Sequence, residues 1–227
     1  PCHRTYDYPL CRDLSINSYN NLFADTIQLT NKVEAENRDT DMPDLSGMRF
    51  SNMKPLGGEL ASEIVVKFSL MMYSRWTYST DTGTYLREVE TVGKADPSPE
   101  YEEYAPHIDY NTGEQLGTDN LVVLVVPHQY YWKTDTTEMV QIDLVGSGDA
   151  IVFRDGFAYP ATWYRPAGGG VLQLFTPGGK SFALKPGTTW FSVINTISEL
   201  EQNDNSWRFI FNPPPEPAEP IIPPDAF

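Results

Sequence analysis

Residues 61–78, ASEIVVKFSLMMYSRWTY, decide the fold class of this chain. Apolar side chains recur at every second position from Ile64 to Tyr78 except at Ser74, and mostly polar ones such as Lys67 fill the positions between them. A period of two over this length is typical of a strand that buries one face. We therefore predict a long strand, bent or bulged near Ser74 because the run exceeds the usual strand length.

The rest of the chain repeats this pattern in short strands separated by turns. Residues 79–83 and the pair Asp155-Gly156 each fit a hairpin turn, and residues 121–126, apolar at both parities, fit a central strand covered on both faces. A helix is predicted from Asp25, as N-cap, to about Asn37, with short turns at 99–104 and 197–202 and loops at 34–53 and 93–106. The predicted fold is mainly β with minor helix (α+β), a layered antiparallel or mixed sheet of hairpins.

Charge and composition narrow the classes of function. The 227 residues carry a formal net charge of −15, which disfavours nucleic acid and anionic membrane surfaces as partners. Residues 121–126 form the longest apolar run, so we expect no transmembrane segment. Aromatic residues make up 13% of the chain; many should pack across strands, and an exposed surplus would mark a protein interface or a sugar-binding face.

The two ends of the chain differ from its body. Cys2 and Cys11 are its two cysteines, and they are either reduced thiols or one disulfide, which would suit an oxidising compartment. Seven of the 19 prolines lie after Asn212, which predicts an extended tail. That tail is either an exposed spacer or an interface segment anchored by Ile221, Ile222 and Phe227. Because the sequence begins at Pro1, we expect a processed chain or a fragment.

One polar cluster, residues 105–113, is the candidate chemical site. His107 and Asp109 would face the same way on a strand, where a carboxylate can orient an imidazole that acts as a base or a metal ligand. The same stretch also suits a tight turn. Asp109 and Asn111 resemble the opening of a calcium loop, but Asn120 at its twelfth position excludes an EF-hand, so a surface calcium site is the remaining calcium alternative.

Motifs for common cofactors and nucleophiles are missing from the sequence. It contains no dinucleotide fingerprint, P-loop or nucleophile elbow, and we therefore expect no cofactor.

A series of short motifs, in order, resembles the YerB-like family of bacterial lipoproteins (domain of unknown function 3048). The motifs are YNNLFADT (19–26), FS (68–69), GTYLR (83–87), PHID (106–109), GEQL (113–116), DNLVV (119–123), GSGDA (146–150), DG (155–156), TWY (162–164) and LKPGTTW (184–190). The resemblance implies a mixed α/β layered fold whose second part is mainly β. It also implies export and lipid anchoring, with no established activity. Arg87, within these motifs, joins His107 and Asp109 as a catalytic candidate.

This resemblance leads to a domain scheme and to three hypotheses on function. Residues 1–53 are interpreted as the remnant of a first domain with one helix and loops, 54–212 as a β-rich C-terminal domain and 213–227 as the proline-rich tail. We expect an extracytoplasmic, non-enzymatic binding or assembly protein with protein partners in an envelope or surface complex. The alternatives are a cell-envelope hydrolase or carbohydrate-active protein that uses His107 and Asp109, and an acidic calcium-dependent binding module.

Overall fold

The computed structural model describes residues 10–15, 21–36, 46–91, 102–134 and 137–213, with the backbone alone described at 133, 134, 137 and 138. The chain divides into two compact units, residues 1–44 and 45–227. Each unit is described by itself below.

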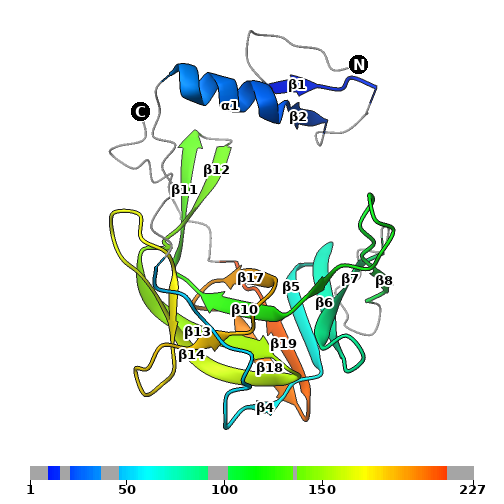
Figure 1. Cartoon of the computed structure of the whole chain (residues 1–227), viewed down its shortest axis with the longest axis vertical. Helices are drawn as coiled ribbons and strands as arrows, with labels where there is room; N and C mark the ends of the chain where they lie inside the picture. The colour runs from blue at the N-terminus through cyan, green and yellow to red at the C-terminus, as the bar shows by residue number, and fades with distance from the viewer. Residues whose placement is uncertain (1–9, 16–20, 37–45, 92–101, 135–136, 214–227) are drawn as a thin grey trace. The chain divides into compact units, whose positions relative to one another are not determined.

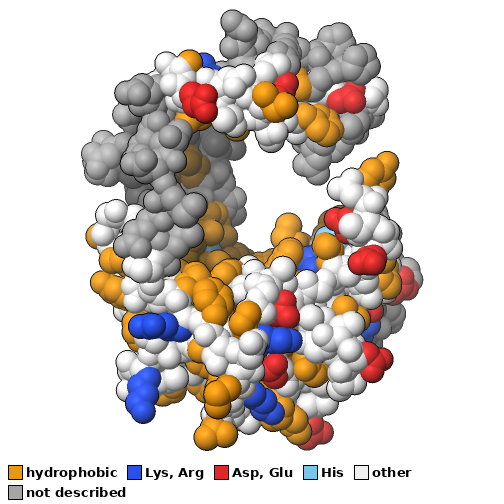
Figure 2. Space-filling view, viewed as in Figure 1, with side chains coloured by type: hydrophobic (Ala, Val, Ile, Leu, Met, Phe, Trp, Pro, Cys, Tyr) orange, Lys and Arg blue, Asp and Glu red, His pale blue; other side chains and the backbone are white. Residues whose placement is uncertain are grey.

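The first unit contains a short hairpin and a helix. Strand β1 (Leu10–Arg12) pairs antiparallel with β2 (Leu22–Ala24), and helix α1 (Thr26–Ala35) follows directly. The Asp25 carboxylate accepts a hydrogen bond from the backbone N–H of Gln28 at 3.1 Å, which confirms the predicted helix start. None of the α1 residues is buried, and hydrophobic side chains reach the surface of this unit, as Figure 2 shows. No helix in the described part of the chain is both long and apolar enough to span a bilayer.

The second unit consists of two large sheets and two small strand pairs (Figure 1). The first large sheet, here the β10 sheet, has the order β15 (Gln173–Phe175), β14 (Phe157–Arg165), β13 (Gly146–Arg154), β10 (Asn120–Val125) and β17 (Thr189–Ile194), with β4 (Glu59–Leu60) paired to β14. The second, the β6 sheet, has the order β18 (Glu199–Asn203), β19 (Ser206–Ile210), β5 (Glu63–Ser69), β6 (Met72–Ser79), β7 (Thr84–Glu90) and β8 (Tyr104–Pro106), with β9 (Gly117–Thr118) also paired to β7.

The small pairs and the mixed sheets complete this architecture. Strand β11 (His128–Thr134) pairs antiparallel with β12 (Thr137–Ile142), and β3 (Arg49–Phe50) pairs parallel with β16 (Ala183–Leu184). Each large sheet is antiparallel except for one parallel pair, β10 with β17 and β5 with β19. The structure therefore confirms a mainly β fold with minor helix.

The central strand β10 is covered on both faces, as its sequence predicts. Leu121 and Val123 belong to a core cluster that contains side chains of both large sheets, including Trp76 and Phe209. Val122 and Leu124, at the other parity, pack into a second cluster around Val152, Tyr159, Trp163 and Phe182. The turn between β13 and β14 is also confirmed, since Asp155 (φ 55°) and Gly156 (φ 77°) both adopt the positive φ of a tight hairpin turn.

The stretch 61–78 forms two strands rather than one. The chain reverses at Leu70 and Met71, so β5 pairs antiparallel with β6, and Ser74 lies inside β6 instead of at a bend. Leu70 and Met72 are 40% and 59% exposed because the alternating burial pattern stops at this reversal. The expected polar face is itself covered at its centre, where Lys67 and Tyr73 are buried.

Two segments predicted as turns or loops contain edge strands. Strand β18 occupies Glu199–Asn203, and β8 occupies Tyr104–Pro106 within the predicted loop 93–106. All five β18 residues are exposed, so this strand carries no burial pattern for sequence reasoning to detect. Similarly, β3 lies in the predicted loop 34–53. The second compact unit begins at Leu45, whereas the sequence analysis places the start of the β-rich domain at residue 54.

Candidate functional site

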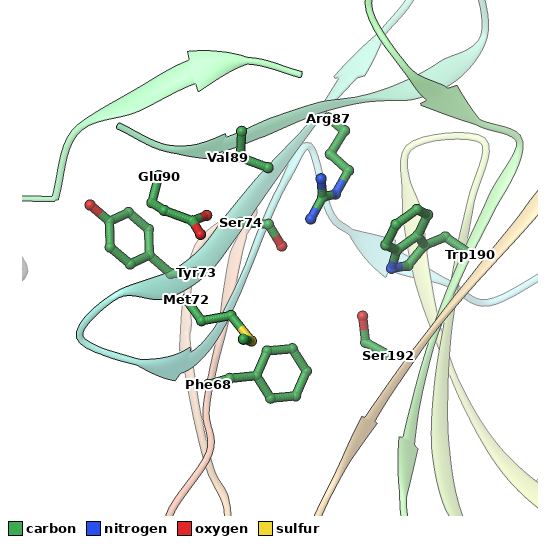
Figure 3. A pocket seen from close by; sticks show the side chains of 9 residues that line it. All are labelled: Phe68, Met72, Tyr73, Ser74, Arg87, Val89, Glu90, Trp190 and Ser192. Carbon is green, nitrogen blue, oxygen red and sulfur yellow. The ribbon is translucent and has the colours of Figure 1, made fainter. Parts of the chain in front are cut away.

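A pocket of about 450 Å³ lies where β17 of the β10 sheet meets β6 and β7 of the β6 sheet. We call it the Arg87 pocket, and Figure 3 shows the side chains that line it. Apolar groups such as Phe68 and Val89 contribute much of its wall, Trp190 adds an indole, and Ser192 adds a hydroxyl. Arg87 and Glu90 are its two charged side chains. A largely apolar pocket with a few polar groups is the usual form of a small-molecule site.

Arg87 is held between two tryptophans and a histidine. It lies opposite Trp76 in the register of β6 and β7, and its Cζ is 4.7 Å from the ring centroid of Trp190 and 5.6 Å from that of Trp76. One terminal nitrogen, Nη1, is hydrogen-bonded to Nδ1 of His107. Since a guanidinium can only donate, Nδ1 of His107 accepts, and this imidazole is neutral with its proton on Nε2.

The guanidinium of Arg87 is incompletely satisfied. Its Nε is buried and has no acceptor among the residues that the structure describes. Burial lowers the pKa of Arg87, although an arginine stays charged at any physiological pH. Burial, followed by the charge of Arg87, also lowers the pKa of His107, which agrees with a neutral imidazole. The pocket therefore contains a fixed positive charge with spare hydrogen-bonding capacity.

Glu90 is the second charge of the Arg87 pocket. No hydrogen bond or ion pair of its carboxylate is found within the described part of the chain, and it is not paired with Arg87. In Figure 3 the Glu90 carboxylate lies on the Tyr73 side of the pocket, while the Arg87 guanidinium extends toward Ser74 and the Trp190 side. The pocket thus has a cationic and an anionic side.

His107 and Asp109 do not line this pocket, and no hydrogen bond between their side chains is found among the described residues, so their catalytic role stays a prediction. The Asp109 carboxylate accepts hydrogen bonds from the backbone N–H groups of Asn111 (3.0 Å) and Thr112 (2.8 Å), and those bonds, the Thr112 one first, lower the pKa of Asp109. Gly113 closes the same turn by donating to the backbone carbonyl of Asp109 at 2.9 Å. Of the three catalytic candidates, the structure brings Arg87 and His107 together and places the Asp109 carboxylate in a tight turn.

The remaining predicted sites are outside this pocket. Asn111 contributes its backbone N–H to the Asp109 turn. Within the described ranges, no group of three His, Cys, Asp or Glu side chains could hold a metal ion, and the calcium site at Asp109 and Asn111 stays a prediction.

The predicted disulfide and interface residues fall partly or wholly beyond the described residues. Cys11 is disulfide-bonded and lies in β1, whereas Cys2 is outside the described residues, so their pairing stays a prediction. The tail anchors Ile221, Ile222 and Phe227 also lie outside them.

A second charged cluster, here the Glu102 cluster, is found on the β6 sheet. Glu102 has a side chain only 3% exposed and accepts hydrogen bonds from Lys67 Nζ (2.7 Å), Arg208 Nη1 (3.0 Å) and Tyr104 Oη (2.6 Å). Burial alone would raise the pKa of Glu102, but the hydrogen bonds from Arg208, Lys67 and Tyr104 outweigh it and lower the pKa to about 2. This carboxylate is fully occupied by the protein itself.

Sequence reasoning missed Glu90, counted Glu102 only among the acidic neighbours of the surface calcium site rather than in an ion cluster, and noticed Trp190 only as part of a motif. Two of the family motifs contain the residues that meet in the pocket, because GTYLR ends at Arg87 and LKPGTTW ends at Trp190. These motifs are the signal in the sequence that could have indicated a shared site. Nothing local to either motif indicates that their last residues meet.

Comparisons with known proteins agree with this architecture. The family model "Protein of unknown function (DUF3048) C-terminal domain" matches residues 64–191, more than half of the chain. The crystal structure of the YerB protein from Bacillus subtilis superimposes with a TM-score of 0.57 at 15% sequence identity, over 82% of this chain and 56% of that one. At this identity the likeness concerns the fold alone, and the chain spans little more than half the length of YerB. No curated protein matches the sequence.

The family match runs from the second residue of β5 through β16 into the first half of β17. It contains eight of the nine side chains of the Arg87 pocket, Ser192 being just beyond it. The resemblance deduced from the motifs is therefore confirmed, and the chain belongs to the DUF3048 C-terminal domain family.

Proposed function

We propose that this chain is an extracytoplasmic, non-enzymatic binding protein whose ligand occupies the Arg87 pocket. The observation that carries the proposal is an accessible pocket of about 450 Å³ that combines apolar walls, an indole and an incompletely satisfied guanidinium. A pocket of that size is within the range that holds a small organic molecule.

The arrangement of polar groups favours binding over catalysis. A hydroxyl nucleophile needs a base within hydrogen-bond reach, and in the described part of the chain neither Ser74 nor Ser192 is bonded to an imidazole or a carboxylate. His107 is engaged by Arg87. The disulfide at Cys11 supports an oxidising, extracytoplasmic setting.

The test is a fragment screen followed by two-dimensional NMR of the tryptophan indole N–H groups. The Trp190 signal is assigned with Trp190→Phe, and fragments that bind in the pocket should shift it while leaving the buried Trp163 signal in place. A chemically diverse set that shifts no signal of a pocket residue would contradict the proposal.

The hydrolase alternative has a test of its own. It requires His107 to act on a glycan or cell-wall substrate, so His107→Ala should abolish any such turnover by the wild-type chain. Unchanged turnover, or none in either protein, counts against it.

A second candidate function is that of a subunit in an envelope or surface complex. The β11–β12 ribbon extends from the rest of the second unit (Figure 1), and Val140 and Ile142 on β12 are 43% and 44% exposed. Exposed apolar side chains of this kind favour a protein contact. A photo-crosslinking residue at Val140 should capture a protein partner in native envelopes, while one at the exposed turn residue Asp204 should not; equal capture at both positions would contradict this role.

A further inference from the structure

Resting on the proposed function, we infer that the Arg87 pocket selects ligands that join one anionic head, a carboxylate or a phosphate, to a flat apolar group. Arg87 binds the head, and Trp190 with its apolar neighbours binds the body.

The first argument is the free edge of the guanidinium. The hydrogen bond to His107 uses Nη1 of Arg87, so the edge formed by Nε and Nη2 carries no hydrogen bond within the described ranges. Two parallel N–H groups on one edge match the two oxygens of a carboxylate or a phosphate, and a bidentate pair of this kind is among the strongest hydrogen-bonded contacts in proteins. Nε is buried, so Nη2 is the end of this edge that a ligand in the pocket reaches first, and the second bond of a bidentate pair requires a neighbour of Nε to move. The positive charge of the guanidinium favours an anion over a neutral acceptor at Nη2.

Three other arginines of the second unit contact a carboxylate, whereas Arg165 donates to the backbone carbonyl of Gly170. Arg75 is bonded to Glu88 at 2.7 Å, Arg154 to Asp155 at 2.8 Å and Arg208 to Glu102. Arg87 instead contacts a neutral imidazole and two indole faces, and burial is the main cause of its lowered pKa. The charge of Glu90 acts on Arg87 without a hydrogen bond or ion pair, so an anion supplied by a ligand would give Arg87 the direct contact with a counter-charge that the protein itself supplies to these other three.

A second buried donor without an acceptor lies beside Arg87. The indole Nε1 of Trp76 is buried and has no acceptor among the described residues, and Trp76 is the cross-strand neighbour of Arg87. The Trp76 ring in turn lies 5.2 Å from the Trp190 ring. Trp76 does not line the pocket and is 1% exposed, so its N–H marks an unsatisfied part of the core next to Arg87 rather than a donor that a ligand meets directly.

The apolar side chains define the rest of the ligand. Trp190 is 38% exposed and lines the pocket with Phe68 and Val89, so a planar apolar group can pack against a ring there. Glu90 limits the negative charge that the pocket accepts, because a second anionic group near it would be repelled. One anionic head on an apolar body is the chemistry that satisfies both constraints.

Three probes of nearly equal size and shape test this inference: benzoate, benzamide and benzamidine, which are anionic, neutral and cationic. Binding is measured from the Trp190 indole shift in the full chain. We expect benzoate to bind at least about tenfold more tightly than benzamide, and benzamidine to bind most weakly. Arg87→Gln should reduce the affinity for benzoate to that for benzamide. Arg87→Lys keeps the positive charge but loses the paired N–H donors of the guanidinium, so it should give an intermediate affinity.

Glu90→Gln is the matched control within the same pocket. It removes a like charge, so benzoate should bind to it at least as tightly as to the wild-type chain. Unfolding midpoints and backbone amide spectra of each variant show whether the fold is intact.

The possible failures separate this inference from the proposed function. Tighter binding of benzamidine than benzoate, or equal binding of all three probes, would overturn the anion selectivity while leaving a binding pocket. No binding of the three probes, when the broader fragment screen finds pocket ligands, would also overturn it. No binding in either experiment would overturn the proposed function itself.

Discussion

The Glu102 cluster and the Arg87 pocket are both built on the β6 sheet, and both withdraw a charged group from water. In the Glu102 cluster, Lys67, Arg208 and Tyr104 surround one carboxylate and satisfy it. In the Arg87 pocket, the guanidinium has a neutral partner, His107, and a buried Nε without an acceptor in the described chain. Nε of Arg208 is likewise buried without an acceptor there, so the two sites differ in the partner of the guanidinium, which is the carboxylate of Glu102 in the cluster and a neutral imidazole in the pocket. A buried charge that contacts its counter-charge stabilises the fold, whereas one without that contact next to a pocket is available to a ligand.

Removing the charge of Glu102 should give the largest loss of stability. Glu102→Gln leaves Lys67 and Arg208 in place without their shared carboxylate, and breaking a buried ion pair in this way costs about 3 kcal/mol or more. Urea unfolding measures the change. The control is Glu88→Gln, which breaks the more exposed Arg75–Glu88 pair and should cost less than about 1 kcal/mol. Equal losses would remove the distinction on which the comparison rests.

Acid should weaken the same cluster. Because the folded-state pKa of Glu102 is about 2, below its ordinary value of 4.5, its contribution is present above pH 4.5 and is lost as the pH falls toward 2. The difference in unfolding free energy between the wild-type chain and Glu102→Gln should therefore shrink by up to about 3 kcal/mol between pH 6 and pH 2. A difference that stays constant with pH would show that the Glu102 charge is not what stabilises the cluster.

Sequence patterns predicted the parts of this fold that depend on near neighbours. Asp25 as a helix cap, the Asp155-Gly156 turn and the doubly covered β10 each follow from a few adjacent residues. The chain reversal at Leu70 and Met71 was not predicted, because two apolar residues form this turn and it contains no glycine, asparagine or proline.

The two charged sites could not be predicted in the same way. Glu102 is 35 residues from Lys67 and 106 from Arg208, and the cluster depends on the parallel pairing of β19 with β5. The Arg87 pocket likewise requires β17 to pair with β10 across the second unit, which brings Trp190 to Arg87. Sequence reasoning selected His107 and Asp109 as the candidate site because they are close along the chain. In the structure, the Asp109 carboxylate accepts hydrogen bonds from the backbone of a turn.

Asp119 extends the comparison to another carboxylate that the protein occupies itself. Its Oδ2 accepts from the backbone N–H of Thr188 at 2.9 Å, and its Oδ1 lies 3.3 Å from Lys185 Nζ. A Cβ added at Gly187, whose φ is 134°, would lie 2.0 Å from Oδ2 of Asp119. We expect Gly187→Ala to lower the unfolding free energy by about 2 kcal/mol, part of it from backbone strain.

The matched control separates strain from the displaced carboxylate. Gly168 also has a positive φ, 92°, but a Cβ there would meet nothing within 4 Å. Gly168→Ala should therefore cost only the strain, about 1 kcal/mol. If both variants lose the same stability in urea unfolding, the Asp119 contacts contribute nothing measurable.

The smallest effect on stability is expected at Arg87. Arg87→Gln loses the contacts with two indole rings, about 0.5–1 kcal/mol each, and the bond to His107, but it also removes a partly buried charge that no carboxylate contacts, since Glu90 acts on it without a hydrogen bond or ion pair. These effects oppose each other, so the unfolding free energy should change by less than about 1 kcal/mol in urea titrations at neutral pH. A loss as large as that of Glu102→Gln would place Arg87 among the residues that hold the fold. A small change in unfolding free energy together with lost benzoate binding would show that the Arg87 charge contributes to ligand binding and not to folding. Burying a charge costs free energy, and in that case the bound anion is what compensates the cost.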